Sequence, residues 1–367
     1  MVTMIVLTGG PCSGKTTALS RIVTYFSGAP RNYKVIIVPE TATELITGGI
    51  APGDCGSNLD FQRCQMNLQL QKEQIFEQAA KSMPDEKILI VCDRGAMDNK
   101  AYMDQETFSC IIQELGISET ELRDRYDAVF HLVTAAKGAE AYYTTANNTA
   151  RTETLEQAAE MDDKVLNAWT GHPHLRMIDN SSDFDGKMHR LMHEISIFLG
   201  EPEPFEIERK YLIRRPDIQW LESLPSCRKV EIIQTYLDIS VSDEETRVRQ
   251  RGNNGSFLYY LTTKQRISDV KRVEVEKRLS KEEYLNLLMC ADTALRPIRK
   301  DRYCLTSGAQ YFEIDIYPGV ENLAIMEIEL SREDQDVTFP EGIEVLREVT
   351  ADAAFLNRSI AEKGFPA

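Results

Sequence analysis

Residues 4–17 read MIVLTGGPCSGKTT, an apolar run that ends in two glycines and continues into a lysine and two threonines. From Gly9 to Thr16 the residues match G-x-x-x-x-G-K-[ST], and a helix-like segment follows. Glycines let the backbone wrap around an anion, which then faces backbone N–H groups and the start of a helix. The pattern predicts a phosphate-binding loop made of Gly9, Gly10, Pro11, Cys12, Ser13, Gly14, Lys15, Thr16 and Thr17.

Around this loop, short apolar runs alternate with helix-like segments through residues 1–200, which is typical of a parallel sheet covered by helices on both faces. The runs that predict strands are 4–8, 34–40, 87–93, 127–133 and 176–179. The segments that predict helices are 15–26, 59–81, 104–115, 152–169 and 184–199. The first half is therefore expected to be a doubly wound α/β domain.

Charged residues at the ends of these runs are expected at the same site. Lys15 would reach the β- and γ-phosphates of a nucleotide, and Thr16 would ligate Mg²⁺. Asp93 ends its run as a Walker-B-type acid and is a candidate Mg²⁺ ligand, with a helix cap as the alternative; Arg94 is a candidate phosphate or substrate contact. Glu40 would accept a proton from a substrate hydroxyl, unless it is a surface residue.

With GGPCSGKTT, VPETATELI, CDRGAMDNKAY and NNTARTETLEQAAEMDDKVLNAW, this half resembles P-loop kinases of the nucleoside-kinase and ribosylnicotinamide-kinase type. The resemblance implies a kinase-like NTPase domain in which Arg151 is a lid arginine that stabilises the transferring phosphate; an exposed loop arginine is the alternative. Because no base-specific motif is visible and N-K-x-D is missing, ATP and GTP remain alternatives as the nucleotide. Asp163 and Trp169 are candidates for nucleotide or partner packing.

The pattern changes after GEPEP (200–204), whose prolines predict a linker, placed at 201–204. Beyond it, eight segments alternate polar and apolar residues, which predicts an antiparallel sheet or barrel from residue 205 to residue 367. Helices are expected at 281–291 and 343–363.

Seven of these eight segments place charges at every second position, so each strand carries its charges on one face. In chain order the charged residues are Glu206, Glu208, Lys210, Arg247, Arg249, Arg251, Lys264, Arg272, Glu274, Glu276, Arg278, Lys300, Arg302, Glu313, Asp315, Glu327 and Glu329. Such a mixture would be costly to bury dry, so this face must meet water or a charged ligand. The periodicity leaves two architectures open, an open sheet with a solvated face or a closed barrel with a polar lumen.

The order of charged segments resembles the CYTH family, the triphosphate tunnel metalloenzymes. The segments are E-x-E-x-K (206–210), R-x-R (247–249), a lysine (264), R-x-E-x-E (272–276), K-x-R (300–302), an acidic strand (313–315) and a closing E-x-E (327–329). The resemblance implies an α/β doubly wound P-loop domain followed by an α+β eight-stranded antiparallel tunnel barrel. In that barrel it implies a phosphate track of Lys210, Arg247, Arg249, Lys264, Arg272, Lys300 and Arg302, with Lys210 also in a catalytic role. Implied ligands of Mg²⁺ or Mn²⁺ are Glu206, Glu208, Glu327 and Glu329, assisted by Glu274, Glu276 or Asp315. Members of the family hydrolyse inorganic triphosphate, nucleoside triphosphates or thiamine triphosphate.

The whole chain also resembles ATP/GTP-binding CYTH proteins of the TRPL translocation defect type, which implies GTP and phosphoinositide binding at a membrane surface. Three functions therefore stay open: a metal-dependent triphosphatase, a regulatory or trafficking module that binds polyphosphate or phosphoinositide without turnover, and a small-molecule kinase. The oligomeric state is also open.

Composition narrows the setting of these functions. A formal net charge of −16 argues against general nucleic-acid binding. The chain has no apolar run long enough to span a bilayer, no evident signal peptide, and eight cysteines without a C-x-x-C pair, so a cytoplasmic protein with reduced thiols is expected.

Overall fold

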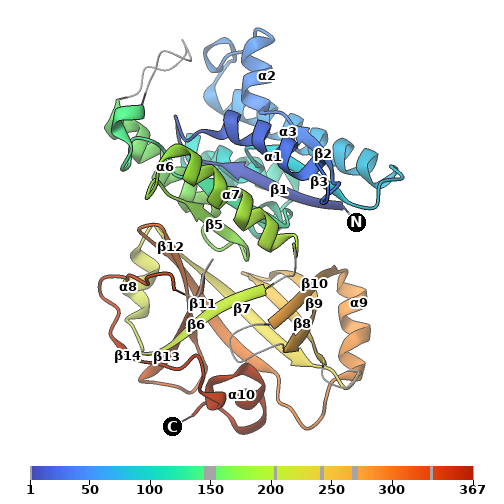
Figure 1. Cartoon of the computed structure of the whole chain (residues 1–367), viewed down its shortest axis with the longest axis vertical. Coiled ribbons are helices and arrows are strands. Elements are labelled where there is room, and N and C mark those ends of the chain that lie inside the picture. The colour runs from blue at the N-terminus through green and yellow to red at the C-terminus, as the bar shows by residue number, and fades with distance from the viewer. Residues whose placement is uncertain are drawn as a thin grey trace. The chain divides into compact units, whose positions relative to one another are not determined.

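The computed structural model describes residues 2–143, 154–201, 205–239, 244–266, 272–330 and 334–366, without the side chains of Tyr142, Phe205, Glu206, Glu244, 264–266 and 272–275. The chain forms two compact units, Met1–His193 and Glu194–Ala367. Each unit is described by itself below, with elements labelled as in Figure 1. The linker expected at 201–204 stays a prediction.

A five-stranded parallel sheet forms the centre of the first unit, in the order β2-β3-β1-β4-β5. Its strands are β1 (Val2–Thr8), β2 (Lys34–Val38), β3 (Ile88–Asp93), β4 (Ala128–Leu132) and β5 (Leu175–Ile178). Ile5, Val6 and Leu7 of the central strand are fully buried, as expected for a strand covered on both faces. The predicted strands are therefore confirmed in place and order along the chain.

Helices cover both faces of this sheet (Figure 1). They are α1 (Lys15–Ser27), α2 (Thr41–Thr47), α3 (Asn58–Lys81), α4 (Gln105–Leu115), α5 (Glu119–Arg123), α6 (Leu155–Trp169) and α7 (Phe184–Phe198), with 3₁₀ turns η1 (Pro52–Asp54), η2 (Ala96–Tyr102) and η3 (Glu140–Tyr142). Several begin at side-chain caps, for example Ser57 before α3 and Asp104 before α4. The short helices α2 and α5 were not predicted, because neither is long enough to show a helical period.

The second unit is built on an antiparallel sheet whose edges meet. Its strands are β6 (Phe205–Arg214), β7 (Cys227–Tyr236), β8 (Glu244–Asn253), β9 (Ser256–Arg266), β10 (Arg272–Leu279), β11 (Ile298–Ser307), β12 (Gln310–Ile316) and β13 (Leu323–Leu330), with β14 (Val345–Glu348) added to β6. The order is β10-β9-β8-β7-β11-β12-β13-β6, and backbone pairing of Arg272 with Glu206 joins β10 to β6. Eight strands therefore close into a barrel, which decides between the two architectures that the periodicity left open.

The outer wall of the barrel is apolar. Tyr211, Ile213, Ile314 and Met326 are buried there, together with Leu221 of α8 (Ile218–Ser223). A second outer cluster packs against α9 (Lys281–Leu287), which continues as η4 (Leu288–Cys290) and confirms the helix expected at 281–291. The side chains that alternate with this wall point into the lumen.

The C-terminal segment differs from the expected single helix at 343–363. It contains strand β14, the 3₁₀ turn η5 (Ala353–Phe355) and a short helix α10 (Asn357–Lys363). Backbone pairing of β14 with β6 overrides the helical pattern, and the apolar residues of this segment close one end of the lumen instead. Val349, Phe355 and Ile360 pack there on Leu212 and Ile325, which share the inward phase of the charged strand positions.

Candidate functional site

The phosphate-binding loop joins β1 to α1 at the carboxyl edge of the parallel sheet. Several of its backbone carbonyl oxygens accept hydrogen bonds. The Gly9 oxygen accepts hydrogen bonds from Lys15 Nζ (3.3 Å) and Arg94 Nη1 (3.2 Å), and the Cys12 oxygen accepts one from the Ala135 N–H (3.3 Å). The first N–H groups of a helix have no acceptor within the helix, so those at the start of α1 can receive an anion. The buried Ser13 hydroxyl has no hydrogen-bond partner within the described part of the chain.

Three glycines of the loop are required by space, and two of them, Gly9 and Gly14, also by a positive φ. A Cβ atom on Gly9 (φ 147°) would lie 2.1 Å from the Leu132 carbonyl oxygen. On Gly10 it would lie 2.7 Å from Asp162 Cβ, and on Gly14 (φ 94°) it would lie 2.7 Å from Phe184 Cε2. The two glycines of the G-x-x-x-x-G motif are therefore at positions where a larger side chain would collide with its neighbours.

The charged residues predicted for this unit converge on the loop. Arg94 Nε donates to Glu40 (2.6 Å), and Arg94 holds a left-handed backbone conformation (φ 68°), a strain typical of functional positions. Burial and the neighbouring Arg94 lower the pKa of Lys15 to about 8. Burial raises the pKa of Asp93, whose buried Oδ1 has no hydrogen-bond partner among the described residues. An uncommitted carboxylate oxygen near Lys15 fits the role of a Mg²⁺ ligand.

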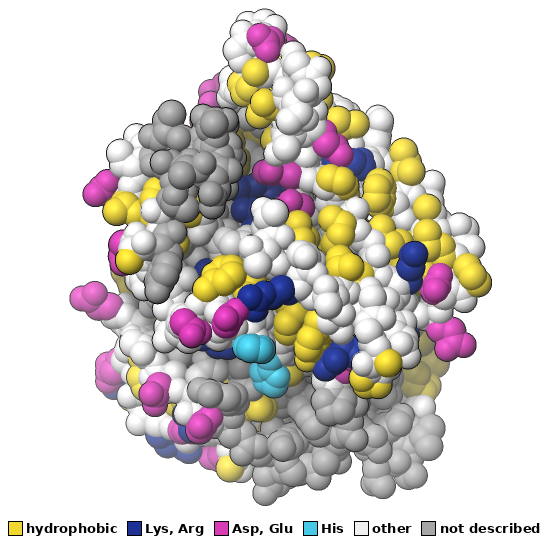
Figure 2. All heavy atoms as spheres, turned by 45° about the horizontal axis from the view of Figure 1, so that its top comes forward, with side chains coloured by type: hydrophobic (Ala, Val, Ile, Leu, Met, Phe, Trp, Pro, Cys, Tyr) yellow, Lys and Arg dark blue, Asp and Glu magenta, His cyan; other side chains and the backbone are white. Residues whose placement is uncertain are grey.

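Figure 2 shows Lys or Arg side chains beside Asp or Glu side chains in a hollow below the protruding tip of the molecule. Thr16 and Thr17 are exposed at the start of α1. Arg151 lies outside the described residues, so its expected role as a lid arginine stays a prediction.

A buried carboxylate that the sequence did not identify holds the loop from behind. Asp162 of α6 accepts hydrogen bonds from the N–H groups of Gly10 (2.8 Å) and Thr134 (3.2 Å), and it contacts His131 Nε2 (3.1 Å) and Lys137 Nζ (3.0 Å). Burial opposes its ionisation, but His131, Lys137 and the Gly10 N–H hold the pKa of Asp162 well below its usual range. Asp162 is therefore a permanent anion that anchors the loop.

Two further residues were missed. Asp98 accepts from the Gly95 N–H (2.7 Å) and from the Thr8 hydroxyl, and lies 3.7 Å from Arg94 Nη1. Its only sequence signal was a cap-like spacing after Gly95. Lys187 of α7 donates to the Ser13 carbonyl (3.2 Å), and no local pattern marked it.

Asp163 and Trp169, the two candidates for nucleotide or partner packing, have structural roles in this unit. Asp163 is exposed and pairs with Lys137 (2.7 Å). Trp169 is fully buried against Tyr126, so it belongs to the core.

A second group of charges lies in the barrel lumen. Lys210 contacts Glu208 (3.2 Å) and, more closely, Glu327. Arg302 forms two bonds to Asp315 (2.7 Å each) and one to Glu327 (2.7 Å), and it also contacts Glu313. Lys210 and Arg302 are thus joined in one network through the carboxylate of Glu327.

Further ion pairs lie on the inner wall of the barrel. Lys300 contacts Asp315, and Arg249 contacts Glu276, whose carboxylate also accepts from the Thr262 hydroxyl (3.1 Å). Despite burial, the surrounding cations hold the pKa of Glu327 well below its ordinary value, and Glu208 and Glu327 raise the pKa of Lys210. These groups therefore stay charged at neutral pH. Arg247 is buried on the same inward phase.

Carboxylates also face each other across neighbouring strands. Glu208 is directly opposite Glu329, and Glu313 is directly opposite Glu327. Like charges in this position destabilise a sheet unless a cation lies between them. Arg302 bridges the second pair. Among the residues that the structure describes, no group of three or more His, Cys, Asp or Glu side chains is placed to hold a metal ion.

Four predicted lumen residues have side chains outside the described part of the chain: Glu206, Lys264, Arg272 and Glu274. Their backbones are paired, Lys264 with Glu274 and Arg272 with Glu206. Their roles as phosphate contacts or metal ligands stay predictions.

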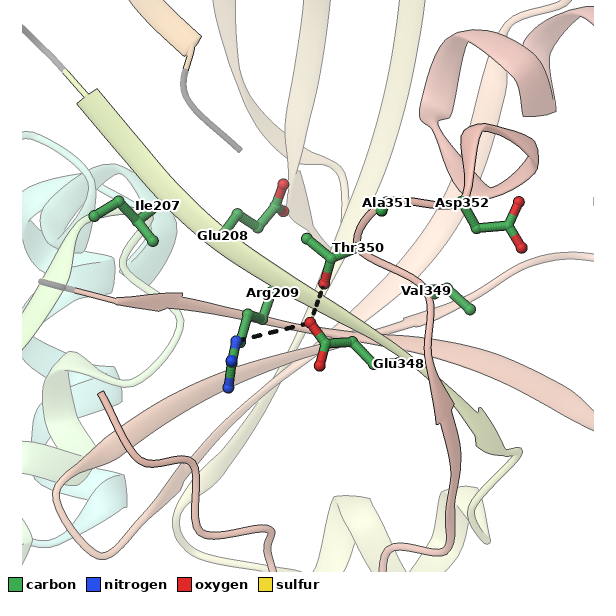
Figure 3. Close-up of a pocket in the computed structure, with 8 residues that line it drawn as sticks. All are labelled: Ile207, Glu208, Arg209, Glu348, Val349, Thr350, Ala351 and Asp352. Carbon is green, nitrogen blue, oxygen red and sulfur yellow. Dashed lines mark hydrogen bonds and ion pairs between the residues drawn. The ribbon is translucent and has the colours of Figure 1, made fainter. Parts of the chain in front are cut away.

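A pocket of about 690 Å³ opens beside β6. Figure 3 shows Glu208 pointing toward this space from β6, with Thr350 and Glu348 contributed by the C-terminal segment. The Thr350 hydroxyl donates to Glu348 (2.7 Å) and accepts from the Lys210 N–H (3.0 Å), so the segment is fixed against β6.

The first unit, with its parallel sheet, glycine loop and converging Lys15 and Asp93, defines a P-loop α/β domain. A family model described as "AAA domain" matches residues 4–187, half of this 367-residue chain. The chain belongs to this AAA domain family. No curated protein matches the chain.

Solved structures similar to the chain include "the hypothetical protein NE1496", with 28% identity over 44% of this chain and 99% of that chain, at a TM-score of 0.31. A second is "the inorganic triphosphatase NE1496", with 28% identity, coverage of 43% and 94%, and a TM-score of 0.30. A third is the PH1012 protein from Pyrococcus horikoshii OT3, with 18% identity, coverage of 35% and 80%, and a TM-score of 0.26. At these TM-scores the likeness by itself carries no conclusion about this chain.

In the described residues, no helix has the length and apolar character needed to cross a membrane.

Proposed function

We propose that the chain binds ATP or GTP through its P-loop unit and hydrolyses a triphosphate, inorganic or nucleoside, in the barrel with a divalent metal ion. The observation that carries the proposal is the closed barrel with Lys210, Lys300, Arg302 and Arg249 all turned into its lumen. A polyphosphate needs a fixed array of cations, and a barrel provides it on rigid strands.

The donor set of the lumen suits a hard divalent ion. The described acidic side chains of the lumen offer carboxylate oxygens, and oxygen is the ligand atom that Mg²⁺ and Mn²⁺ prefer. Glu208 and Glu329 face each other directly, an arrangement that a cation between them would relieve. We assign these two as metal ligands, with Glu327 released from Lys210 when phosphate arrives. When bound, the ion would supply positive charge that neutralises the phosphoryl oxygens.

The chain's own cations would orient the substrate. Arg302, which already holds three carboxylates in a planar fork, can exchange one of them for phosphate oxygens. Lys210 is placed between Glu208 and Glu327, where its ammonium would contact the phosphate being released. The apolar closure around Leu212 and Phe355 favours a substrate that enters with its phosphate end first.

The test is phosphate release by the full chain from inorganic triphosphate, ATP and GTP, with Mg²⁺, Mn²⁺ or EDTA. We expect metal-dependent release that Lys210→Ala and Glu329→Gln each lower by at least tenfold. Lys229→Ala is the matched control, since Lys229 is a partly exposed barrel lysine paired with Asp301.

Lys15→Ala separates the two units, because it should remove nucleotide binding at the P-loop and leave release from inorganic triphosphate intact. Tight binding of the triphosphates or of a phosphoinositide headgroup with no release under any metal condition would replace the hydrolase by a binding module, the regulatory function of TRPL translocation defect-type proteins.

A small-molecule kinase is a second candidate for the P-loop unit. It is favoured by the Glu40–Arg94 pair beside Lys15, since a carboxylate there can accept a proton from an acceptor hydroxyl. Although burial opposes it, Arg94 holds the pKa of Glu40 below its ordinary value, so Glu40 is ionised at neutral pH and can accept a hydrogen bond from an acceptor hydroxyl. Glu40→Gln should then abolish transfer to an acceptor while leaving nucleotide affinity within about threefold.

A further inference from the structure

An exposed aromatic ring lies directly beside the phosphate-binding loop. Phe184, the first residue of α7, is 43% exposed, although its ring is in contact range of the loop. A Cβ atom on Gly14 would lie only 2.7 Å from Phe184 Cε2 and 3.3 Å from Cζ. One part of the ring therefore rests on the loop, and the rest is open to solvent.

The position of this ring is fixed by the same helix. Lys187, one turn further along α7, is buried and donates to the carbonyl oxygens of Ser13 (3.2 Å) and Val133 (2.6 Å) and to Asn180 Oδ1 (2.8 Å). Three neutral acceptors on separate segments tie the first turn of α7 to the loop. Phe184 is thus held in place rather than free to swing away.

A cation flanks the ring. The Arg21 guanidinium of α1 lies 5.8 Å from the centroid of the Phe184 ring, and it pairs with Asp185, the next residue of α7. The arginine and the aromatic ring are therefore adjacent on the side of the loop where α1 and α7 begin.

A nucleotide held by its β- and γ-phosphates in the loop must place its nucleoside beyond the loop. The start of α1 receives the phosphates, and the ring on Gly14 is an exposed aromatic surface next to that start. We propose that Phe184 is the surface on which the nucleotide base stacks, with Arg21 contacting the nucleotide from the side. The proposal rests on the nucleotide-binding function of the P-loop unit proposed above.

Stacking has a consequence for specificity. Every base has a π-face, so a ring without hydrogen-bonding groups accepts adenine and guanine alike. We therefore expect the P-loop unit to bind adenine and guanine nucleotides with affinities that differ by less than about threefold, which agrees with the missing N-K-x-D signature.

The test uses the full chain and displacement of a fluorescent ADP analogue by ADP, GDP and pyrophosphate with Mg²⁺. Only the binding that Lys15→Ala removes is counted, which excludes nucleotide held in the barrel. Phe184→Ala should weaken ADP and GDP by a similar factor, roughly 5- to 150-fold, and leave pyrophosphate within about twofold. Phe184→Trp should restore both nucleotides. Val23→Ala, an exposed aliphatic residue of α1, is the control and should change nothing.

Each other outcome overturns the proposal in a distinguishable way. If Phe184→Ala weakens pyrophosphate as much as ADP, the ring only shapes the loop and does not stack. If Phe184→Ala changes ADP and GDP by less than twofold while Lys15→Ala removes them, the base lies elsewhere and nucleotide binding stands. If Lys15→Ala leaves nucleotide binding unchanged, the P-loop function itself is wrong, and the stacking proposal falls with it.

Discussion

Replacement of Asp162 should separate the hydrogen-bonding role of the loop anchor from its charge. The carboxylate is fully buried and serves two backbone N–H groups, those of Gly10 and Thr134. Asp162→Ala leaves both N–H groups without an acceptor, at about 1–3 kcal/mol each. It also removes one of the two carboxylates that pair with the partly buried Lys137. We expect a loss of about 3–5 kcal/mol in the free energy of unfolding of the first unit.

Asp162→Asn keeps an oxygen acceptor and removes the charge. Hydrogen bonds to charged groups contribute about 1.5–3 kcal/mol, so a loss in that range is expected. The matched control is the adjacent Asp163→Asn, whose side chain is 61% exposed and whose loss should stay below about 0.5 kcal/mol.

The assay is urea unfolding followed by tryptophan fluorescence. The chain has two tryptophans, of which Trp169 is buried in the first unit, so a Trp220→Phe background makes the signal specific to that unit. The pKa of Asp162 is lower in the folded protein than in the unfolded chain, so its stabilisation is complete at neutral pH. That stabilisation is lost as the pH falls below about 4 toward the folded pKa.

Stability of the parent protein should therefore fall more steeply below pH 4 than that of Asp162→Asn. Equal acid sensitivity of the two proteins, or a loss below 1 kcal/mol for Asp162→Ala, would refute the anchor role.

Three further changes test the two sites. Because the pKa of Lys15 is lowered from 10.5 to about 8, nucleotide affinity measured by calorimetry should fall as the pH rises from 8 to 9.5, and a flat profile over that range would contradict it. Gly14→Ala should weaken nucleotide binding at least tenfold, because its Cβ would collide with Phe184. Gly116→Ala, also in a left-handed conformation (φ 65°) but facing open space, should not weaken it. Arg302→Met should lower the free energy of unfolding, measured by calorimetry, by about 3–5 kcal/mol, because it leaves buried carboxylates without their cation. Arg214→Met, at an exposed ion pair, should lower it by less than about 1 kcal/mol, and equal losses would contradict the lumen network.

Much of the fold was readable from the sequence, because both units repeat a simple period. Continuous apolar runs marked the five parallel strands, and strict alternation marked the eight strands of the barrel. The C-terminal segment was misread as one helix because its apolar spacing is compatible with a helical period. The edge of β6 at Ile213, available for pairing with Val345, is a tertiary feature that no local window contains.

The sites were readable only where a motif is contiguous. The loop from Gly9 to Thr16 is recognised by its contiguous motif. Its anchor Asp162 is 152 positions from Gly10, and Lys187 is 174 positions from Ser13, so no local pattern connects them to the loop. In the barrel, alternation predicted which residues share a face. It did not predict that Arg302 would hold carboxylates from two neighbouring strands, since register and side-chain reach decide those pairs.

In the triphosphate-binding function proposed above, the ion-paired lumen would link the binding of anions to the binding of cations. Lys210 and Arg302 hold Glu327 in place, so a phosphate that takes over these cations releases a carboxylate that had been engaged. The released carboxylate has lost its counter-ion and gains affinity for a divalent ion. By thermodynamic linkage the ion must then strengthen phosphate binding by the same factor. Neither ligand alone should fill this barrel well, and the pair should bind cooperatively, so that the barrel selects the metal–polyphosphate complex over either component.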